Sequence, residues 1–416
     1  SRSSAASDVY KRQLLGSGVG FSIKKEHVYQ LPKVKRSRIK IIRQDDASAD
    51  YIVPDTREGW VKLLGKVLKA YYYSGKGFTY STQLIRGKGA AIKGFGGTAS
   101  GPESMVAGIN QIIGVLDSRK GQKLRPIDCL DVMNIIGSIV VSGNVRRSAQ
   151  LAIGDYDDVE YLKAKRWDLG VIPNWRNMSN NSVDCPDTNL LTQEFWDTYK
   201  QGEPYGLVNI DLSRRVGRLG DTRYKDPDVQ GFNPCVEQSL NDKETCCLAE
   251  VYLPNIESPE ELDAVVKMLY RVNKHSLALK CSLPETEEIV HKNMRMGIGV
   301  TGNAMASEAQ KYWLADCYEN LREYDKVYSK ENGFNESIKL TTVKPSGTLS
   351  LLAGVTSGVH PSTAGSYFIR RISVASDSSL IDVCMANGYH VEYKRHFDGT
   401  EDKSTFIVSF PCSYPE

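Results

Sequence analysis

The residues best suited to chemistry stand in one five-residue window. Asn233-Pro234-Cys235-Val236-Glu237 combines an amide, a thiol and a carboxylate, and Cys246-Cys247 brings a further thiol eleven positions after Cys235. In an extended or finger-like loop, side chains two positions apart point the same way, so Asn233, Cys235 and Glu237 could face one small substrate. Such a window suits nucleophilic attack, metal ligation or thiol redox chemistry.

Redox chemistry fits this pattern best. A zinc site typically has two close-spaced ligand pairs, whereas the window offers Cys235, the pair Cys246-Cys247 and no nearby His. We therefore predict no metal ligands. A cysteine hydrolase needs a His partner, and none of the six histidines carries a local signature for that role. A lone Cys is most often buried and inert, but Pro234 and Glu237 make that alternative weaker for Cys235.

The composition is that of an ordinary globular protein. The 416 residues are 41% hydrophobic, and the net charge of +3 neither favours nor excludes a polyanionic partner. No apolar run approaches the roughly 20 residues that span a bilayer. Nine cysteines without a secretory signal indicate reduced thiols in a cytoplasmic protein. We expect no nucleic-acid partner and no membrane association.

Helices and strands alternate along the chain, which indicates an α/β fold. A helix with an apolar stripe is predicted to begin at residues 55–58, and a second apolar helix at residues 128–141 leads into a glycine-containing loop. Residues 258–261 form a capping box with Pro at the first helical position. Strands are predicted at residues 207–210, 249–253, 338–343 and 406–410, and within residues 24–43, whose basic face is expected to be solvated.

Three further segments suggest chemistry only weakly when each is taken alone. Pro345-Ser346-Gly347-Thr348 offers hydroxyls and backbone N–H groups at a helix start, which suits either an anion site or an ordinary helix cap. Arg146 and Arg147 could pair with phosphates or with carboxylates. Residues 16–20 are rich in glycine but lack the spacing of a dinucleotide-binding loop, and the chain has no full Walker A sequence.

Together and in this order, the segments resemble the ribonucleotide reductases, specifically the adenosylcobalamin-dependent class II enzymes. Residues 233–237 with Cys246 resemble the family's finger loop, residues 143–149 its second specificity loop, and residues 344–350 its substrate-phosphate loop. Pro234 and the eleven-residue interval favour class II over the class I large subunit. Further matches lie at residues 16–21, 96–102, 358–361 and 369–371.

The resemblance implies a ten-stranded α/β barrel of two five-stranded halves with the finger loop at its centre. Residues 24–80 resemble an insertion of the monomeric triphosphate reductases, which replaces an effector surface that dimeric enzymes borrow from a second subunit, so a monomer is implied. Residues 1–13 are polar and lack an initiating Met, and we expect them to be a non-native leader outside the fold. Residues 14–416 would then be a partial reductase barrel domain, truncated at both ends.

The resemblance also implies roles for the window. Cys235 would carry a thiyl radical generated with adenosylcobalamin, Glu237 would take the proton of the substrate 3′-OH, and Asn233 would bind the ribose hydroxyls. Cys246 would be one thiol of the reducing pair. Cys247 is expected to be structural, because its side chain should point away from that of its neighbour. The second reducing cysteine, and the cysteines that accept electrons from a thioredoxin-type reductant, are expected outside the chain, so this fragment alone should not turn over.

Substrate and effector sites follow from the same resemblance. Pro345, Ser346, Gly347 and Thr348 would bind the phosphates of a ribonucleotide, with triphosphates as the expected substrates. A deoxynucleotide effector would be read by the residues Gly143, Asn144, Arg146, Arg147, Gly97 and Thr98. Three alternatives stay open: a class I large subunit that uses a separate metallosubunit, a catalytically dead nucleotide-binding regulator, and an unrelated α/β hydrolase or ligase.

Overall fold

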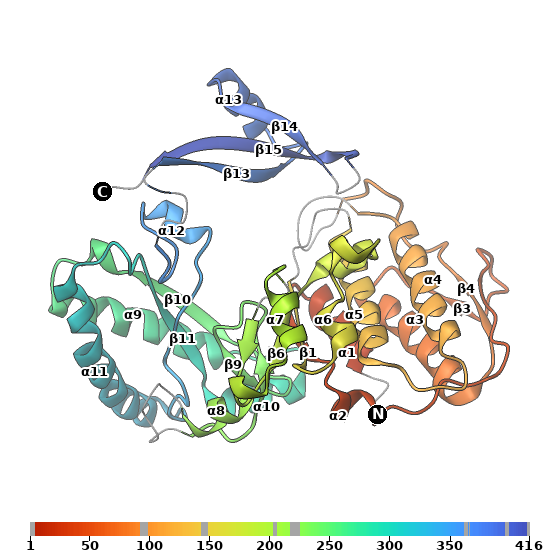
Figure 1. Cartoon of the computed structure of the whole chain (residues 1–416), viewed down its shortest axis with the longest axis horizontal. Coiled ribbons are helices and arrows are strands. Elements are labelled where there is room, and N and C mark those ends of the chain that lie inside the picture. Colours follow the sequence, from red (N-terminus) through yellow and green to blue (C-terminus); the bar gives the residue numbers. More distant parts are fainter. Residues whose placement is uncertain are drawn as a thin grey trace. The chain divides into compact units, whose positions relative to one another are not determined.

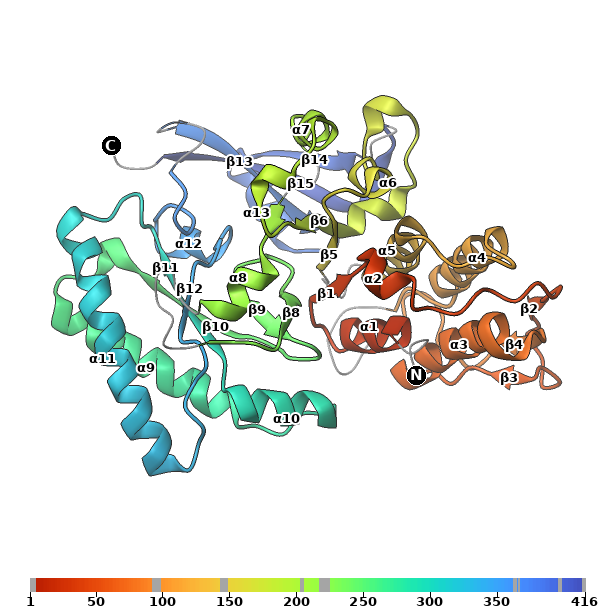
Figure 2. The ribbon, with the colours of Figure 1, turned by 60° about the horizontal axis from the view of Figure 1, so that its bottom comes forward.

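The computed structural model describes most of the chain, namely residues 5–91, 99–142, 149–202, 206–216, 225–361, 365, 367–395 and 399–413. The chain divides into two compact units, residues 1–242 and residues 243–416. Each unit combines helices with short sheets, as Figures 1 and 2 show. The predicted mixture of α and β structure is therefore confirmed.

A four-stranded parallel sheet supports the site residues of the first unit. Its strands lie in the order β1 (Val19–Ser22), β5 (Gln150–Asp155), β6 (Ser179–Asp184) and β7 (Gly206–Val208). The register sets β1 beside the start of β5 and the start of β5 beside the start of β6. Strand β5 is buried along almost all of its length, which is typical of a parallel strand covered on both faces.

Four helices of the first unit share one hydrophobic cluster: α1 (Ala5–Leu14), α3 (Arg57–Lys69), α4 (Glu103–Ser118) and α5 (Pro126–Val141). Figure 2 shows α1 lying beside α3. Helix α3 begins where predicted because the Thr56 hydroxyl accepts a 3.0 Å hydrogen bond from the Gly59 N–H. The apolar stripe of α3 is buried. Helix α5 includes all of residues 128–141, where the second helix was predicted. Both helix predictions are confirmed.

Residues 24–43 are mostly not β-strand, so that prediction is wrong. They contain the helical turn α2 (Lys25–Val28) and a single short strand, β2 (Ile41–Arg43), which pairs with β4 (Phe78–Ser81) beside β3 (Tyr51–Ile52). The turn is held by acidic residues at the ends of neighbouring strands, because Lys24 Nζ lies 2.8 Å from Asp184 Oδ2 and the Lys25 N–H donates to Asp155 Oδ2 at 2.7 Å.

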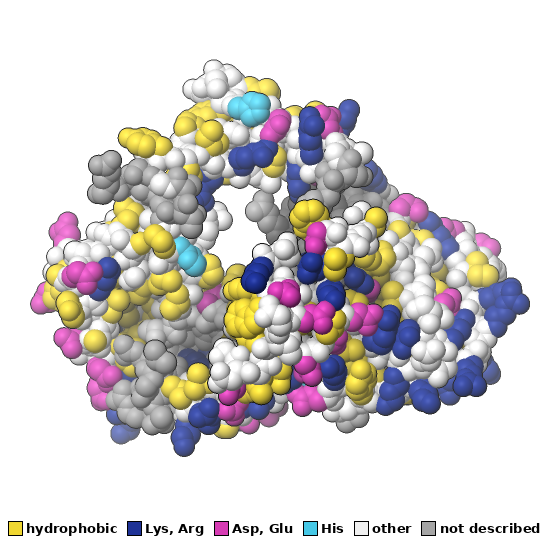
Figure 3. All heavy atoms as spheres, viewed as in Figure 1, with side chains coloured by type: hydrophobic (Ala, Val, Ile, Leu, Met, Phe, Trp, Pro, Cys, Tyr) yellow, Lys and Arg dark blue, Asp and Glu magenta, His cyan; other side chains and the backbone are white. Residues whose placement is uncertain are grey.

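Five of the eight basic side chains of this stretch are exposed. They are Lys33, Lys35, Arg36, Arg38 and Lys40, whereas Lys24, Lys25 and Arg43 are half-buried. Figure 3 shows Lys and Arg side chains over the part of the first unit that contains β3, β4 and α3. The expectation of a solvated basic face is confirmed, although the backbone beneath it is irregular.

The stretch expected to lie outside the fold takes part in it. Residues 5–13 form most of α1, in which Tyr10, Gln13 and Leu14 are almost fully buried. The expectation of a separate leader is wrong for these residues, because the apolar side chains of an amphipathic helix join the hydrophobic cluster of α3, α4 and α5. Whether the stretch is native stays a prediction.

The second unit is built on a parallel sheet of β10 (Cys247–Tyr252), β11 (Met296–Thr301) and β12 (Thr341–Thr342). Helix α9 (Pro259–Leu277) begins at the predicted capping box, where the Ser258 hydroxyl accepts a 3.1 Å hydrogen bond from the Glu261 N–H. Figure 1 shows α9 beside this sheet and α11 (Glu308–Asn332) beside α9. This unit also contains α10 (Pro284–Asn293), α13 (Leu380–Ala386) and an antiparallel sheet in the order β13 (Tyr367–Ala375), β15 (Glu401–Ser413), β14 (His390–Arg395).

Short elements join these parts. They are η2 (Ala70–Ser74), α6 (Val159–Leu162), η3 (Trp167–Leu169), η4 (Asn174–Met178), η5 (Thr188–Leu190), α7 (Gln193–Tyr199), α8 (Ile210–Arg215), β8 (Val229–Phe232), β9 (Ser239–Asn241), η6 (Leu253–Asn255) and α12 (Leu349–Leu352). The four strands predicted outside residues 24–43 are present as β7, β10, β12 and β15, with shifted ends. Within the described ranges, no helix has both the length and the apolar character needed to cross a bilayer.

Candidate active site

The window of Asn233 to Glu237 forms a tight loop between β8 and β9. These two strands pair antiparallel, with Phe232 opposite Ser239. The Asn233 N–H donates to the Gln238 carbonyl at 3.1 Å, and the Gln238 N–H donates back to Asn233 Oδ1 at 3.0 Å. The Val236 N–H closes a turn onto the Asn233 carbonyl at 2.9 Å, and Val236 has a φ of 72°. The loop is therefore fixed by its own hydrogen bonds.

The turn changes which side chains face solvent. Cys235 is exposed at the loop, Asn233 is buried, and Glu237 is half-buried with its Oε2 atom buried. Because the left-handed backbone at Val236 interrupts an extended conformation, the alternation expected for residues 233, 235 and 237 does not hold along the loop. Asn233 serves the loop itself through Oδ1, a structural task that its position in the motif does not reveal.

Two neighbouring strands hold the loop in place. At Gly20 in β1, a Cβ atom would stand 2.1 Å from the Phe232 carbonyl oxygen, and at Gly18 it would stand 2.7 Å from Pro234 Cγ. From β6, Asn180 Nδ2 donates to the Pro234 carbonyl at 3.1 Å. Gly18 and Gly20 therefore have a structural reason to be glycine, which is close approach of the loop that carries Cys235.

Cys246 and Cys247 begin the sheet of the second unit. Cys247 is the first residue of β10, and its Sγ atom lies 3.4 Å from Asn273 Oδ1. Burial raises the pKa of the Cys247 thiol above its ordinary value, which lowers its reactivity near neutral pH. This environment agrees with the structural role expected for Cys247. Cys246 is half-buried just before the strand, and all nine cysteines are free thiols.

Residues Pro345 to Thr348 form a fixed loop in the second unit, between β12 and α12. Ser346 is buried and has a φ of 50°. The Ser350 hydroxyl donates to the Ser346 carbonyl at 2.6 Å, and Arg370 Nη1 donates to the Gly347 carbonyl at 2.9 Å. A Cβ atom at Gly358 would stand 2.5 Å from the Lys344 carbonyl oxygen, so the chain is also packed closely behind the loop.

An ion pair anchors the start of this loop to the sheet. Lys344 Nζ lies 2.7 Å from Glu250 Oε1, and the Thr301 hydroxyl donates to Glu250 Oε2 at 2.8 Å. Burial opposes ionisation of Glu250, but the hydrogen bonds from Lys344 and Thr301 favour the charged form, and the pKa of this carboxyl is lowered. The predicted phosphate loop begins at Lys344, but its partner Glu250 was not predicted, because nothing in the local pattern around position 250 marks it as a partner of position 344.

We expect Lys344→Met to weaken this anchor in a pH-dependent way. A depressed carboxyl pKa contributes stability above the unfolded-state pKa, and this contribution is lost as pH falls through the folded-state pKa. The variant should therefore lose about 1–3 kcal/mol of unfolding free energy at pH 7, and the difference from wild type should shrink below pH 4.5, the ordinary pKa of Glu. Urea unfolding of wild type and variant, at pH 7 and again below pH 4.5, measures this difference in unfolding free energy.

The matched control for this prediction is Lys311→Met. Lys311 pairs with Glu308 at 2.8 Å on the exposed surface of α11, so its loss should cost less than about 1 kcal/mol at either pH. Equal losses in the two variants, or a Lys344→Met effect that does not change with pH, would contradict the anchoring role of Glu250.

The residues expected to read the effector lie outside the described part of the chain. These are Gly97, Thr98, Gly143, Asn144, Arg146 and Arg147. The described flanks are Ser142, which follows α5, and Ala149, whose carbonyl accepts a 3.0 Å hydrogen bond from the Val19 N–H. Strand β5, which follows residues 143–148, is thus tied to β1, the same strand that supports the loop of residues 233–237.

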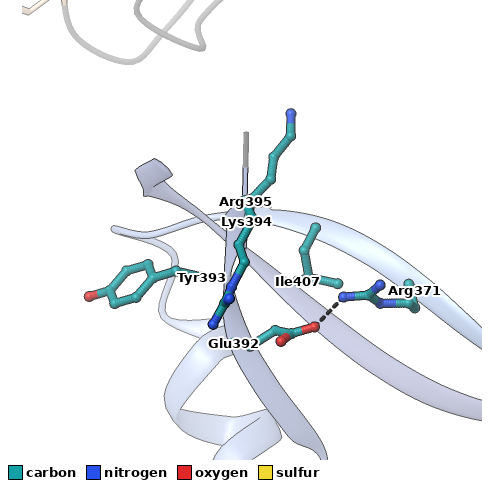
Figure 4. Close-up of a pocket in the computed structure, with 6 residues that line it drawn as sticks. All are labelled: Arg371, Glu392, Tyr393, Lys394, Arg395 and Ile407. Carbon is teal, nitrogen blue, oxygen red and sulfur yellow. Dashed lines mark hydrogen bonds and ion pairs between the residues drawn. The ribbon is translucent and has the colours of Figure 1, made fainter. Parts of the chain in front are cut away.

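A hollow of about 540 Å³ lies on the antiparallel sheet of the second unit. It is lined by Arg371, Glu392, Tyr393, Lys394, Arg395 and Ile407. Figure 4 shows Arg371 directed toward Glu392, with which it forms an ion pair. None of the site residues predicted from the sequence lines this hollow. Among the described residues, no group of three or more His, Cys, Asp or Glu side chains is arranged to hold a metal ion.

Two family models match the chain. The insertion domain of B12-dependent ribonucleotide reductase matches residues 24–116, and the barrel domain of ribonucleotide reductase matches residues 174–316. The first match starts at the residue expected for the insertion but continues beyond residue 80, through β4 and almost all of α4. This extension is consistent with the packing, since α4 contributes to the same hydrophobic cluster as α3.

Curated relatives and a solved structure agree with these matches. The adenosylcobalamin-dependent ribonucleoside-triphosphate reductases of Lacticaseibacillus paracasei and Euglena gracilis are 33% and 34% identical, over 97% and 91% of this chain and 62% and 52% of their own lengths. A crystal structure of a B12-dependent (class II) ribonucleotide reductase aligns with a TM-score of 0.80 and 28% identity, covering 99% of this chain and 64% of that one. The chain thus spans somewhat more than half the length of its curated relatives. It belongs to the adenosylcobalamin-dependent, class II family of ribonucleotide reductases.

Proposed function

We propose that the chain is the catalytic part of an adenosylcobalamin-dependent ribonucleoside-triphosphate reductase, which converts ribonucleotides to 2′-deoxyribonucleotides. The observation that carries the proposal is the exposed Cys235 thiol on a loop that two strands and its own hydrogen bonds hold in place. A thiol that carries a radical must be accessible to a substrate atom. It must also be held in a fixed position, because a mobile radical would react with other groups. The names of the curated relatives support the same activity.

Each residue of the window and Cys246 has a separate part in the proposed reaction. The Cys235 thiyl radical takes the 3′ hydrogen atom of the ribose and returns it at the end, while Glu237 accepts the proton of the 3′-OH. Cys246 and a second cysteine outside this chain supply two electrons and two protons. The 2′-OH then leaves as water, and the two thiols become a disulfide, which a thioredoxin-type reductant restores. Asn233 contributes through its Nδ2 group, which can donate to a ribose hydroxyl while Oδ1 holds the loop.

Adenosylcobalamin supplies the radical chemistry when it is bound. The exposure of Cys235 fits such a cofactor, because a thiol that is oxidised by a separate bound group must be reachable from outside its own loop. Cys235 is the residue that would face the cofactor. The insertion domain at residues 24–116, whose family model is that of the B12-dependent enzymes, supports class II over a class I large subunit with a separate metallosubunit.

Substrate phosphates are proposed to bind at Pro345 to Thr348. The support is a loop of small residues whose backbone is held by Ser350 and Arg370, with Lys344 at its start. A deoxynucleotide effector is proposed at residues 97–98 and 143–147. The insertion from residue 24 onward would serve the effector site without a second subunit, so we propose a monomer, located in the cytoplasm.

The two parallel sheets are proposed to belong to the two halves of a ten-stranded barrel. The first unit contributes β1, β5, β6 and β7, and the second contributes β10, β11 and β12. Parallel strands separated by helices in both units are what such halves require. The likeness to a class II reductase structure over 99% of this chain supports the proposal.

The experiment uses the full-length protein that contains this chain, purified without metal-containing partners. Mixed with adenosylcobalamin, a ribonucleoside triphosphate, a deoxynucleotide and reduced thioredoxin, it should form deoxyribonucleotide, and rapid freezing should trap an electron paramagnetic resonance signal of a thiyl radical coupled to cob(II)alamin. Turnover that appears only after addition of a metal-containing subunit would instead assign the chain to class I. Nucleotide binding with neither product nor signal would support the catalytically dead regulator.

A further inference from the structure

A fully buried ion pair lies just before the parallel sheet of the second unit. Arg295 Nε stands 3.0 Å from Glu244 Oε2, and neither side chain is exposed to solvent. Asn293 Nδ2 donates to the other carboxylate oxygen, Glu244 Oε1, at 2.9 Å. Moving two charges out of water is costly, and apolar side chains of similar size often stabilise a protein interior at least as well as a buried ion pair. Stability alone is therefore a poor explanation for this pair.

The backbone is strained next to both members of the ion pair. Among the described residues other than glycine, four have a left-handed backbone. Two of them, Val236 and Ser346, lie in the finger loop and the proposed phosphate loop. The other two are Lys243, with a φ of 62°, and Met294, with a φ of 42°, and each directly precedes one member of the ion pair. Such conformations are unfavourable for L side chains, and they cluster where a structure holds functional groups in position.

The two strained segments are also tied to other parts of the second unit. The Thr286 hydroxyl of α10 donates to the Lys243 carbonyl at 2.8 Å. The Ile338 N–H donates to the Asn293 carbonyl at 2.9 Å. The chain before each member of the ion pair is thus fixed, and the ion pair joins the two segments.

Cys246 is the residue that this arrangement positions. It is half-buried and follows Glu244 by two residues. The next residue, Cys247, begins β10 opposite Met296 of β11, and Arg295 directly precedes Met296. Cys246 and Arg295 therefore come immediately before the first residue pair of this ladder, on neighbouring strands. The ladder fixes the chain after Cys246, and the ion pair fixes the chain before it.

We propose that Glu244 and Arg295 are positioning residues that hold the Cys246 thiol in place for the reducing step. The proposal rests on the proposed function, in which Cys246 and a second thiol give two electrons and two protons to the substrate and become a disulfide. A disulfide requires Cβ atoms about 3.5–4.5 Å apart, so the thiol tolerates little displacement. A buried ion pair with a further hydrogen bond suits this task, because it fixes direction as well as distance.

The main variant is Glu244→Leu with Arg295→Met in the full-length protein. It removes both charges together and leaves no buried charge without a partner, so it should fold. In the nucleotide-free protein, iodoacetamide should alkylate Cys246 about fivefold faster than in wild type or more, because thiol reactivity follows access to the sulfur. Peptide mass spectrometry measures this rate. The Cys384 thiol of α13, which is also half-buried, is the internal reference and should change by less than about twofold.

A second readout separates loss of position from damage to the fold. In a single turnover of reduced protein with adenosylcobalamin and nucleotides, the thiyl signal of Cys235 should keep its wild-type amplitude in the main variant. The deoxyribonucleotide formed should fall by about tenfold or more. Unfolding would instead lower both quantities together. Arg295→Lys, which keeps a positive charge beside Glu244, should recover part of the product.

The matched control removes another fully buried ion pair of the same unit. Lys274 Nζ and Asp325 Oδ1 are 2.9 Å apart, and Lys274→Met with Asp325→Asn should leave Cys246 alkylation and product formation near wild type. Should the main variant fail to fold, Asn293→Ala carries the test. It removes one hydrogen bond of Glu244 and should raise the alkylation rate by about twofold to fivefold.

Three results would overturn the proposal: wild-type alkylation of Cys246 in the folded variant, the same increase in the control, or equal losses of signal and product. A wild-type protein that forms neither signal nor product would instead reject the proposed function. Faster alkylation of Cys246 in the main variant would in that case still support its positioning by Glu244 and Arg295.

Discussion

Replacing Cys235 with serine is expected to abolish ribonucleotide reduction by the full-length protein. Serine fills nearly the same space, so the loop hydrogen bonds of Asn233 and Gln238 should persist. The variant has an O–H bond in place of the weaker S–H bond. An alkoxyl radical cannot form on serine under conditions that oxidise a thiol, so position 235 can no longer carry the radical. We expect a loss of product on the order of 10⁴-fold or more, and no cob(II)alamin-coupled thiyl signal. Product assays and electron paramagnetic resonance measure the two effects separately.

Two matched variants separate this loss from general damage to a free thiol. Cys281→Ser changes another partly exposed cysteine and should retain near wild-type turnover and the full signal. Cys247→Ser tests the neighbour of the proposed reductant Cys246 and should also leave the signal intact. In Cys235→Ser, the Kd values for nucleotide and for effector should stay within about threefold of wild type. Deoxyribonucleotide formation by Cys235→Ser would contradict the radical assignment.

The predictable parts of the fold are those with local causes. The first turn of α3 follows from Thr56, whose hydroxyl satisfies a backbone N–H that the helix leaves without a partner, and the same is true of Ser258 at α9. The strand prediction for residues 24–43 failed because the interleaving of basic residues with Val and Ile is a local pattern, whereas the turn at Lys25 depends on Asp155 and Asp184, more than a hundred residues away. Alternation alone contains no information about such partners.

The candidate site also has a part that the sequence predicts and a part that it does not. The motif around Cys235 is contiguous, so its residue types are visible in the sequence. Its support is not, because Gly20 and Asn180 reach the loop from strands that are distant in the chain. The glycine spacing at residues 16–20 did carry a signal, since glycine within a strand often marks close approach of another backbone. The partner in that approach, Phe232, could be known only from the tertiary structure.

Gly20→Ala is expected to have the second largest effect, although it changes no group that takes part in the chemistry. The added methyl would stand 2.1 Å from the Phe232 carbonyl oxygen, and backbone on both sides leaves neither partner free to rotate away. We expect β8 and the finger loop to be displaced, with a loss of about 1–3 kcal/mol of unfolding free energy and of roughly 10²-fold in kcat, because a shift of about 1 Å at a reacting group is that costly.

Gly114→Ala is the matched control. Gly114 lies in α4 with open space around its Cα, so alanine there should stabilise the protein by about 0.5–1 kcal/mol and leave kcat unchanged. The decisive comparison is kcat of Gly20→Ala at a temperature where the variant is fully folded. Wild-type turnover under that condition would show that the close contact between β1 and β8 serves stability alone, whereas a persistent loss would show that this contact sets the position from which Cys235 reaches the substrate.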